Sequence, residues 1–431
     1  MGIVRESRRR TRAPRRVGRV LPRRLGSDTL SEPSNPTPAV ETPLTIQALP
    51  ELPVVHVGSS EALKAAADDW KQSDVLAFDT EFVRERTFFP RLGLIQVCDG
   101  RAAFLIDPLS IEDLSPLGDI LRAPGILKVL HSASEDVEVF WRALGVVPSP
   151  LLDTQIAAGL AGLAPSLGYQ KLTLAVLGIE ICKGETRTNW LARPLSPEQL
   201  AYAVEDVTCL LSAYRVLRQR LEELGRFEWA LEDSMEVVDT ERFEERPLEA
   251  YRRLRAAGRL TPPQLGVLRA LAAWRDTEAR RRDIPRSFVV KDDALVALAQ
   301  RQPKDAEELA RVKDLDPRQA KRDGDSFLEL IRAALQQPAA DLPAAPTAAL
   351  STPAGRDLER RLRETARKRA EELGMAPEVL VTRRPIEALV RSTLLDRRPQ
   401  LPEELAGWRL PVIGQALLDD AKEAAAHGGD L

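Results

Sequence analysis

The feature that most constrains the fold is a single change in the pattern of the sequence. Between residues 53 and about 225, short apolar runs of strand type alternate with segments of helical periodicity, which favours an α/β layer architecture. From about residue 245 onward the strand signals disappear and the chain reads as a series of short helices. We therefore expect an α/β body followed by helical modules. The length of 431 residues suits this division, because it exceeds what one hydrophobic core usually serves.

A β-hairpin is expected inside the α/β body. The apolar segments Leu94–Cys98 and Ala102–Ile106 flank the pair Asp99-Gly100, which is typical of a two-residue hairpin turn. A further short strand is predicted at Val75–Phe78.

Two segments differ from the rest in composition. Residues 1–52 contain a basic head, with ten arginines and one acid in the first 26 residues, followed by a linker rich in Pro, Ser and Thr. The head is either a nucleic-acid arm or the result of a start codon placed too far upstream, and we expect a disordered, dispensable tail. Residues 339–354 predict a second linker.

The charge and the rare residues exclude several classes of protein. The head carries a charge of about +9, which leaves about −12 for the remainder of a chain whose net charge is −3, so any nucleic-acid contact must use local patches. No apolar run approaches the roughly 18 residues that span a bilayer. The three cysteines are far apart and indicate reduced thiols in the cytoplasm. With three histidines a zinc site is not expected, and His131 is expected to be structural or to contact substrate.

One pair of acids follows a predicted strand. Asp79 and Glu81 come directly after the apolar run that ends at Phe78, and strand alternation places both side chains on one face, with Thr80 opposite. Neighbouring carboxylates repel each other unless a cation lies between them, so the pair suits a divalent metal. The same spacing recurs in helical segments, where it marks a solvated face. The position at a strand end, where open α/β sheets bind ligands, favours the metal interpretation.

A third acid is expected at the start of a helix. Ser132 and Glu135 fit a capping box that follows the buried strand Ile126–Leu130, which places Asp136 in the first helical turn. An acid in this position can simply interact favourably with the helix dipole. The strand–turn–helix geometry nevertheless also projects Asp136 toward the sheet edge where Asp79 is expected.

The fourth acid belongs to a well-marked helix. Ser196 is a predicted N-cap, Pro197 suits the first helical position and Gln199 the third, so the helix start is strongly indicated. Tyr202 and Asp206 lie four residues apart and therefore stack on one face, beside an apolar stripe. An acid beside a buried stripe is unfavourable unless it is hydrogen-bonded or binds a metal.

Together these segments predict a two-metal hydrolytic site. Four acids at one sheet edge cannot all be ionised without divalent cations, and two Mg²⁺ ions about 3.5–4 Å apart would offset the repulsion and align an in-line attack on a phosphodiester. Mn²⁺ is the alternative ion. Tyr202 is expected to hydrogen-bond to the attacking water and orient it, rather than to act as a base.

The same segments resemble a known family. VLAFDTEFVRERTFFPRLGLIQV, VLHSASEDVEVF and YAVEDVTCLL resemble the three exonuclease motifs of the DEDD superfamily, and a tyrosine four residues before the last acid is typical of its DEDDy branch. The extended first motif, with GETRTNWLARPLSPEQLAYA, resembles ribonuclease D. The resemblance implies a ribonuclease H-like mixed sheet over residues 53–240 and 3′→5′ trimming of RNA, including tRNA precursors. It gives metal-ligand roles to Asp79, Glu81, Asp136 and Asp206, and the water-orienting role to Tyr202.

The helical part extends the resemblance. Residues 258–338 resemble an HRDC domain, a small all-α module that binds nucleic acid, and residues 355–425 look like a diverged second HRDC domain. Arg280 and Arg286 belong to a basic cluster around one helix end, which is either a solvated surface or a set of phosphate contacts. Phe88, after the first motif, either stacks on terminal bases or belongs to a core.

The expected protein is a cytoplasmic monomer that binds RNA, with tRNA precursors as its substrates, and removes nucleotides from the 3′ end. Two alternatives stay open from the residues alone. The first is a DNA 3′→5′ exonuclease with the same site, because carboxylates do not distinguish the two sugars. The second is a non-catalytic RNA-binding scaffold, against which the presence of all five site residues argues.

Overall fold

The computed structural model describes residues 49–181, 184–185, 188–239, 246–343, 350 and 352–427. The expected basic head and almost all of its linker lie outside the described residues, as do residues 344–349 and 351 of the second expected linker. Within the described ranges, no helix is both long and apolar enough to cross a lipid bilayer.

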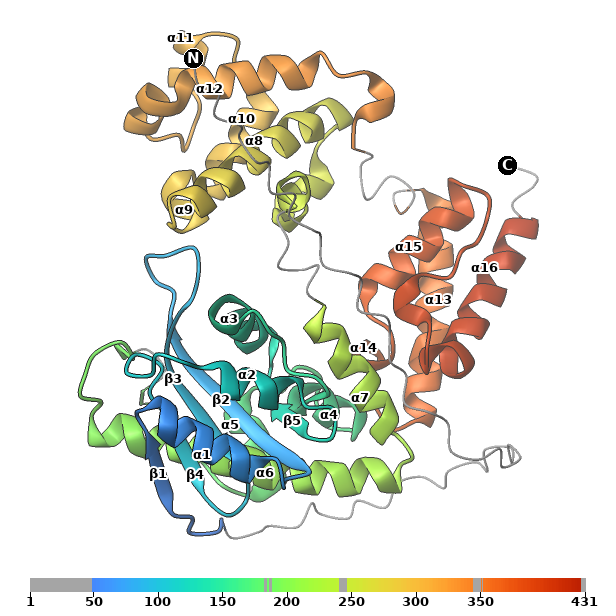
Figure 1. Cartoon of the computed structure of the whole chain (residues 1–431). Coiled ribbons are helices and arrows are strands. Elements are labelled where there is room, and N and C mark those ends of the chain that lie inside the picture. Colours follow the sequence, from blue (N-terminus) through green and yellow to red (C-terminus); the bar gives the residue numbers. More distant parts are fainter. Residues whose placement is uncertain are drawn as a thin grey trace, which may run out of the picture. The chain divides into compact units, whose positions relative to one another are not determined.

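A six-stranded mixed sheet forms the centre of the N-terminal body, in the order β1-β4-β3-β2-β5-β6 (Figure 1). The pairs β2–β3 and β3–β4 are antiparallel, whereas β1–β4, β2–β5 and β5–β6 are parallel. The expected mixed α/β sheet is therefore confirmed. The strands are β1 (Val54–Val57), β2 (Val75–Val83), β3 (Arg91–Cys98), β4 (Ala103–Ile106), β5 (Leu127–Leu130) and β6 (Leu151–Asp153).

The β3–β4 hairpin is present, but its turn is longer than the two residues that the sequence predicts. Cys98 pairs with Ala103, so four residues connect the strands. The side chain of Asp99 explains the difference, because its Oδ1 accepts hydrogen bonds from the backbone amides of Arg101 (2.8 Å) and Ala102 (2.9 Å).

Helices cover both faces of the sheet, and β2 alternates between the two cores. Leu76 and Phe78 lie in the core beneath the first three helices, whereas Ala77 lies in the core beneath the next three. Period-two alternation then predicts that Asp79 faces the same side as Ala77. The helices of the first face are α1 (Ser60–Trp70), α2 (Ser115–Arg122) and α3 (Ser134–Leu144), and those of the second are α4 (Thr154–Leu160), α5 (Tyr169–Leu177) and α6 (Pro197–Glu223).

After α6 the described chain is helical, as the sequence predicts. The helix α7 (Phe227–Met235) and the short η1 (Glu236–Val238) end the body. A first helical module follows, with η3 (Pro247–Arg253), η4 (Arg255–Arg259), α8 (Pro262–Arg281), α9 (Arg286–Val289), α10 (Asp292–Arg301), α11 (Ala306–Ala310), α12 (Pro317–Leu335) and η5 (Ala339–Asp341). A second module contains α13 (Pro353–Glu372), α14 (Pro377–Leu380), α15 (Arg383–Leu394), η6 (Glu403–Leu405), the π-helical turn η7 (Leu410–Gly414) and α16 (Gln415–His427).

The two helical modules are packed in different ways. The first module has its own hydrophobic core, to which Phe88 of the β2–β3 connection also belongs. The second shares one continuous core with the body, in which Leu358 and Leu362 of α13 join residues of α4, α5 and α6. This shared core makes the second module an integral part of the body rather than a tethered domain.

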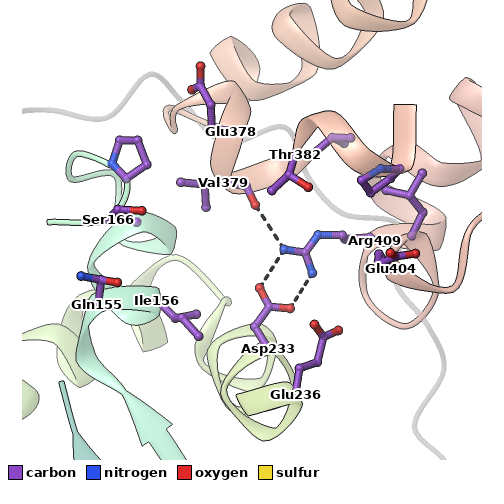
Figure 2. A pocket seen from close by; sticks show the side chains of 15 residues that line it. Gln155, Ile156, Ser166, Asp233, Glu236, Glu378, Val379, Thr382, Glu404 and Arg409 are labelled. Carbon is purple, nitrogen blue, oxygen red and sulfur yellow. Dashed lines mark hydrogen bonds and ion pairs between the residues drawn. The ribbon is translucent and has the colours of Figure 1, made fainter. Parts of the chain in front are cut away.

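Polar contacts accompany the shared core. Figure 2 shows the Arg409 guanidinium beside a pocket that residues of the body and of the second module line together. The guanidinium nitrogens of Arg409 are directed at the Asp233 carboxylate and the Val379 carbonyl oxygen. Arg409 donates to both oxygens of Asp233, at 2.5 and 2.8 Å. Trp408, the preceding residue, stacks on Trp229 with ring centroids 4.4 Å apart and planes 6° apart. A two-pronged ion pair and an aromatic stack thus fix η7 against α7.

Candidate active site

The strand that carries the first two acids is longer than the sequence predicts. β2 continues through Asp79 and Glu81 to Val83, so both acids lie within the strand and not after it. The pairing explains this, because β3 pairs with β2 along this stretch, whereas the pairing with β5 ends at Ala77. The two acids therefore lie where β2 no longer pairs with β5 but still pairs with β3.

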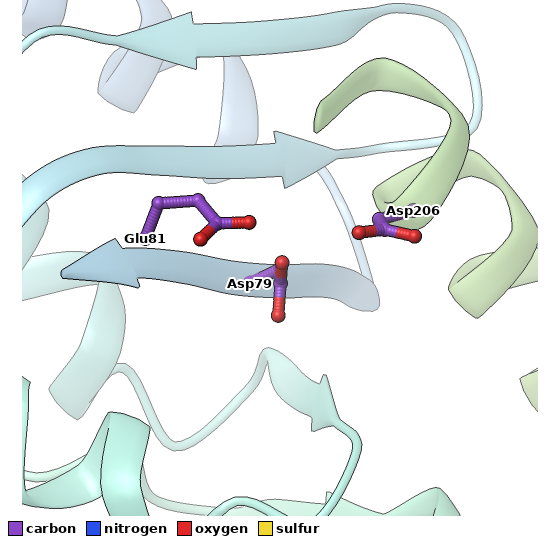
Figure 3. Close-up of side chains that lie close together, drawn as sticks. All are labelled: Asp79, Glu81 and Asp206. Carbon is purple, nitrogen blue, oxygen red and sulfur yellow. The ribbon is translucent and has the colours of Figure 1, made fainter. Parts of the chain in front are cut away.

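Three carboxylates meet at this place. Asp79, Glu81 and Asp206 each present an oxygen, and these oxygens all lie within 4.8 Å of one another (Figure 3). Strand alternation puts the first two on the face that α6 covers, and α6 supplies Asp206, which is 5 % exposed. The predicted helix start is confirmed, since Ser196 and Gln199 form a capping box.

Asp136 lies near this group but outside it. It is in the first turn of α3, as predicted, and is 8 % exposed. The Oγ1 atom of Thr80 donates a hydrogen bond to Asp136 Oδ1 at 2.5 Å. Thr80 points to the α3 side of β2, opposite to its two acidic neighbours, so its hydroxyl links the fourth acid to the strand of the first two.

The start of α3 is built differently from the expected capping box. Ala133, not Ser132, is the N-cap, and no side chain of the helix itself caps it. Instead Asp153, at the end of β6, accepts hydrogen bonds from the backbone amides of Ser132 (2.8 Å) and Ala133 (2.9 Å). The positive φ of 54° at Ser132 turns these amides toward that carboxylate. Sequence spacing does not predict this cap, because Asp153 is distant from Ser132 in the chain and the pairing of β5 with β6 brings it close.

Burial raises the pKa values of all four acids, and repulsion by other acids of the group raises those of Asp79 and Glu81 further. Burial, then the charges of the other three acids, raises the pKa of Asp79 well above its ordinary value. Burial, then Asp206 and Asp136, raises the pKa of Glu81 to about 9. Burial raises the pKa values of Asp136 and Asp206 to about 7, against hydrogen bonds from Thr80 and Tyr202 that lower them. Four such groups cannot all be ionised at neutral pH without a compensating cation.

The donor set fits a divalent metal ion. Carboxylate oxygens are the ligands that Mg²⁺ and Mn²⁺ prefer, and a cluster of raised pKa values is typical of such a site. Asp206 Oδ1 is buried and has no hydrogen-bond partner among the described residues, so it retains a lone pair for a ligand. A divalent cation would lower the pKa of each acid by stabilising the ionised form.

Tyr202 lies one helical turn before Asp206, on the same side of α6. Its hydroxyl forms a hydrogen bond with the Asp206 carboxyl, and burial, followed by the charges of Asp206 and Glu81, raises its pKa above the ordinary range. The hydroxyl therefore stays protonated and acts as a donor. The ring packs near Trp190, with centroids 6.2 Å apart, and Trp190 is itself fully buried.

Two further side chains lie near the site: Tyr169, which no motif in the sequence indicates, and His131, which the sequence predicts to be structural or to contact substrate. The hydroxyl of Tyr169, at the start of α5, donates to the backbone carbonyl oxygen of Asp206. His131 packs beside Tyr169, with ring centroids 5.2 Å apart, and its Nδ1 lies 3.0 Å from Thr154 Oγ1. Both side chains therefore support the position of α6 over the sheet.

The sequence left open whether Phe88 and the basic cluster around Arg280 and Arg286 contact nucleic acid. In the structure, Phe88 and these two arginines contact one another and other parts of the protein. Phe88 is 4 % exposed, and the guanidinium groups of Arg280 and Arg286 lie 4.9 and 4.5 Å from its ring centroid. Both arginines form ion pairs with Asp276, at 2.8 and 2.5 Å. Phe88 is thus a core residue of the first helical module, and these two arginines are engaged within the protein.

Comparison with known proteins agrees with the fold. Residues 54–222 match the family described as 3′-5′ exonuclease, and residues 264–331 match the HRDC domain. Ribonuclease D of Pseudomonas paraeruginosa is 44 % identical over 356 residues, which cover 83 % of this chain and 94 % of that protein. Ribonuclease D of Haemophilus influenzae is 38 % identical, over 85 % of this chain and 92 % of that protein.

A solved structure is similar over most of the chain. The crystal structure of Escherichia coli RNase D, an exoribonuclease involved in structured RNA processing, superposes with a TM-score of 0.77 at 35 % sequence identity. The match covers 86 % of this chain and 99 % of that one.

Proposed function

The chain belongs to the ribonuclease D family and is a 3′→5′ exoribonuclease, and from this premise we propose which of its residues perform the hydrolysis. Asp79, Glu81 and Asp206 would hold the catalytic cation, with Asp136 completing the set through its position beside β2. The observation that carries the proposal is the convergence of three carboxylate oxygens within 4.8 Å of one another.

Two divalent ions, Mg²⁺ or Mn²⁺, would supply an activated water and stabilise the charge that develops on the leaving 3′ oxygen. The chain's own groups position the reactants. Thr80 fixes the rotamer of Asp136, and Tyr169 holds the Asp206 backbone through its carbonyl oxygen. Tyr202, protonated and one turn from Asp206, would hydrogen-bond to the attacking water and orient it.

We propose tRNA precursors as the RNA substrates. The support is the similarity to an enzyme described as involved in structured RNA processing, together with an HRDC domain, which is a nucleic-acid-binding module. We also propose that the protein acts as a cytoplasmic monomer. The free thiols of Cys98 and Cys209, both buried, fit a reducing compartment.

One assay tests the site and the substrate together. A tRNA precursor with a 3′ trailer is digested by the wild type and by Asp79→Ala, Tyr202→Phe and Asp119→Ala. Asp119 lies on the exposed surface of α2 and serves as the matched control. We expect Asp79→Ala to lower kcat about 10³-fold or more, because metal charge stabilisation contributes several kcal/mol and about 1.4 kcal/mol corresponds to tenfold.

Tyr202→Phe should lower kcat about 10²-fold with RNA affinity retained, because only the orientation of the water is lost. EDTA should abolish the activity of the wild type, and Mg²⁺ or Mn²⁺ should restore it. Full activity in EDTA, or an Asp79→Ala protein as active as Asp119→Ala, would contradict the proposed site. Faster loss of a DNA oligonucleotide of the same sequence would contradict the RNA substrate.

A further inference from the structure

A buried amide lies directly beside the acidic cluster. Gln96 is in the middle of β3, is 0 % exposed, and pairs across the strands with Asp79 of β2. Residues directly opposite each other in an antiparallel pair point to the same face, so Gln96 shares the α6 face with Asp79. Its neighbours on this face of β3, Leu94 and Cys98, pack in the clusters that contain α6 residues.

Neither polar atom of this side chain is satisfied by the protein. Among the described residues, Gln96 Nε2 and Oε1 have no hydrogen-bond partner. A side-chain amide offers two donor hydrogens and one acceptor oxygen, and a buried one is nearly always hydrogen-bonded because its desolvation opposes folding. Its other neighbours on this face, Leu94 and Cys98 of β3 and Leu105 of β4, are buried and apolar, so packing against them alone would favour leucine here.

The distance across the strand pair allows a direct contact. Side chains opposite each other in such a pair have Cβ atoms about 4.5–5.5 Å apart, which the longer glutamine side chain can bridge. Its complete burial means that Gln96 cannot touch RNA from solvent. The acceptor group that the strand register places directly opposite Gln96 is the carboxylate of Asp79.

We propose that Gln96 is a positioning residue of the hydrolytic site, whose amide Nε2, without a partner among the described residues of the metal-free protein, donates a hydrogen bond to the Asp79 carboxylate when the cation is bound and orients this carboxylate toward the cation. The inference rests on the proposed function, because it assumes that Asp79 is a metal ligand. A donor behind a ligating carboxylate restricts its rotation and favours its ionised form. Gln96 thus acts through Asp79 and makes no contact with substrate.

The test separates a positioning role from a structural one. Gln96→Leu removes the amide at nearly constant volume, and Mn²⁺ binding to the full-length protein is measured by calorimetry, with thermal unfolding of the metal-free protein measured in parallel. Thr208→Val is the matched control. Thr208 Oγ1 is likewise buried without a partner, but it lies two residues after Asp206, about 200° around α6.

We expect Gln96→Leu to weaken Mn²⁺ binding about 10- to 100-fold, as loss of a group supporting a metal ligand does. It should also raise the melting temperature of the metal-free protein, because an unsatisfied buried amide is removed. Thr208→Val should raise the melting temperature and leave Mn²⁺ affinity unchanged. At limiting Mn²⁺, kcat of Gln96→Leu should fall while KM for RNA stays constant.

Two results would overturn the inference. One is a Gln96→Leu protein with Mn²⁺ affinity within about twofold of wild type. The other is a lower metal-free melting temperature for both Gln96→Leu and Gln96→Met, which would make the amide a structural group. Asp79→Ala distinguishes this failure from failure of the proposed function. If Asp79→Ala loses Mn²⁺ while Gln96→Leu keeps it, only the role of Gln96 is wrong. If both keep it, the metal site itself is wrong.

Discussion

At the scale of single residues, the four buried acids are unfavourable when all are ionised, and a bound cation would offset this cost. Their pKa values in the folded, metal-free protein lie well above that of an ordinary carboxyl group, which is near 4. The folded state therefore binds more protons than the unfolded chain between about pH 4 and 9. By linkage, the free energy of unfolding of the metal-free protein falls as pH rises through this window.

The raised pKa values of these acids predict the pH dependence of metal binding. A cation must displace the protons of Asp136 and Asp206, with pKa values of about 7, and of Glu81, with a pKa of about 9. Mn²⁺ affinity should rise from about pH 6 to about pH 9, by about tenfold per pH unit for each proton displaced, and then level off. Calorimetry in two buffers with different ionisation enthalpies measures the released protons directly. An affinity independent of pH between about 7 and 9 would show that the acids are already ionised.

At the scale of elements, the connection between β2 and β3 is held from two sides. Arg84 forms a two-pronged ion pair with Glu138 of α3 and donates from Nε to the Phe88 carbonyl oxygen at 2.9 Å. From the first helical module, Asp283 Oδ1 accepts the backbone amides of Phe88 (2.9 Å) and Phe89 (3.0 Å). The strand that carries two of the four acids is thus anchored at its far end by a module outside the sheet.

Removing that anchor should loosen the connection. Asp283 has a positive φ of 46°, which glycine adopts without strain, so Asp283→Gly deletes the two hydrogen bonds and keeps the backbone. Bonds to a charged acceptor contribute about 1.5–3 kcal/mol, so amide hydrogen exchange at Phe88 and Phe89 should accelerate about tenfold or more. Asp283→Asn is the control, because asparagine also tolerates this φ and keeps an acceptor oxygen. Equal exchange rates in Asp283→Gly and wild type would mean that the loop is ordered without the module.

At the scale of the whole molecule, the second helical module completes the hydrophobic core of the body. Leu358, Leu362 and Ala366 of α13 lie in the same cluster as residues of α4 to α7. Arg226, between α6 and α7, donates to the carbonyl oxygens of Leu160 and Leu373 and so joins the two parts. Deleting the chain beyond residue 355 should consequently expose this core and lower stability, and not only weaken RNA binding.

The contribution of the second helical module to the stability of the body can be tested at the stack between Trp229 and Trp408. Trp408 also donates from Nε1 to Asp233 at 2.8 Å, so Trp408→Ala removes an aromatic contact and a hydrogen bond together. We expect a loss of about 3–5 kcal/mol in the free energy of unfolding, determined from urea transitions followed by circular dichroism. Leu410→Ala, two residues away and 41 % exposed, is the control and should change stability by less than about 0.5 kcal/mol. Similar losses for both variants would mean that the stack contributes no specific stability.

The sequence by itself determined the features that depend on local periodicity. Alternation along β2 places Asp79 and Glu81 on one face, and a spacing of four places Tyr202 over Asp206, because both follow from the geometry of a strand or a helix. The Ser196 capping box follows from the same kind of local rule. The α/β body and the helical modules after it were predicted on the same grounds, whereas the mixed sheet was implied by a family resemblance that the comparisons confirm.

Only the tertiary structure decided which groups meet across long separations in the chain. Thr80 hydrogen-bonds to Asp136 across 56 residues, and Asp283 to Phe88 across 195. Gln96 comes to lie beside Asp79 because the strand register places it there, and local pattern does not set that register. The physical reason is common to these cases: a hydrogen bond depends on distance in space, whereas periodicity reports only which way a side chain points.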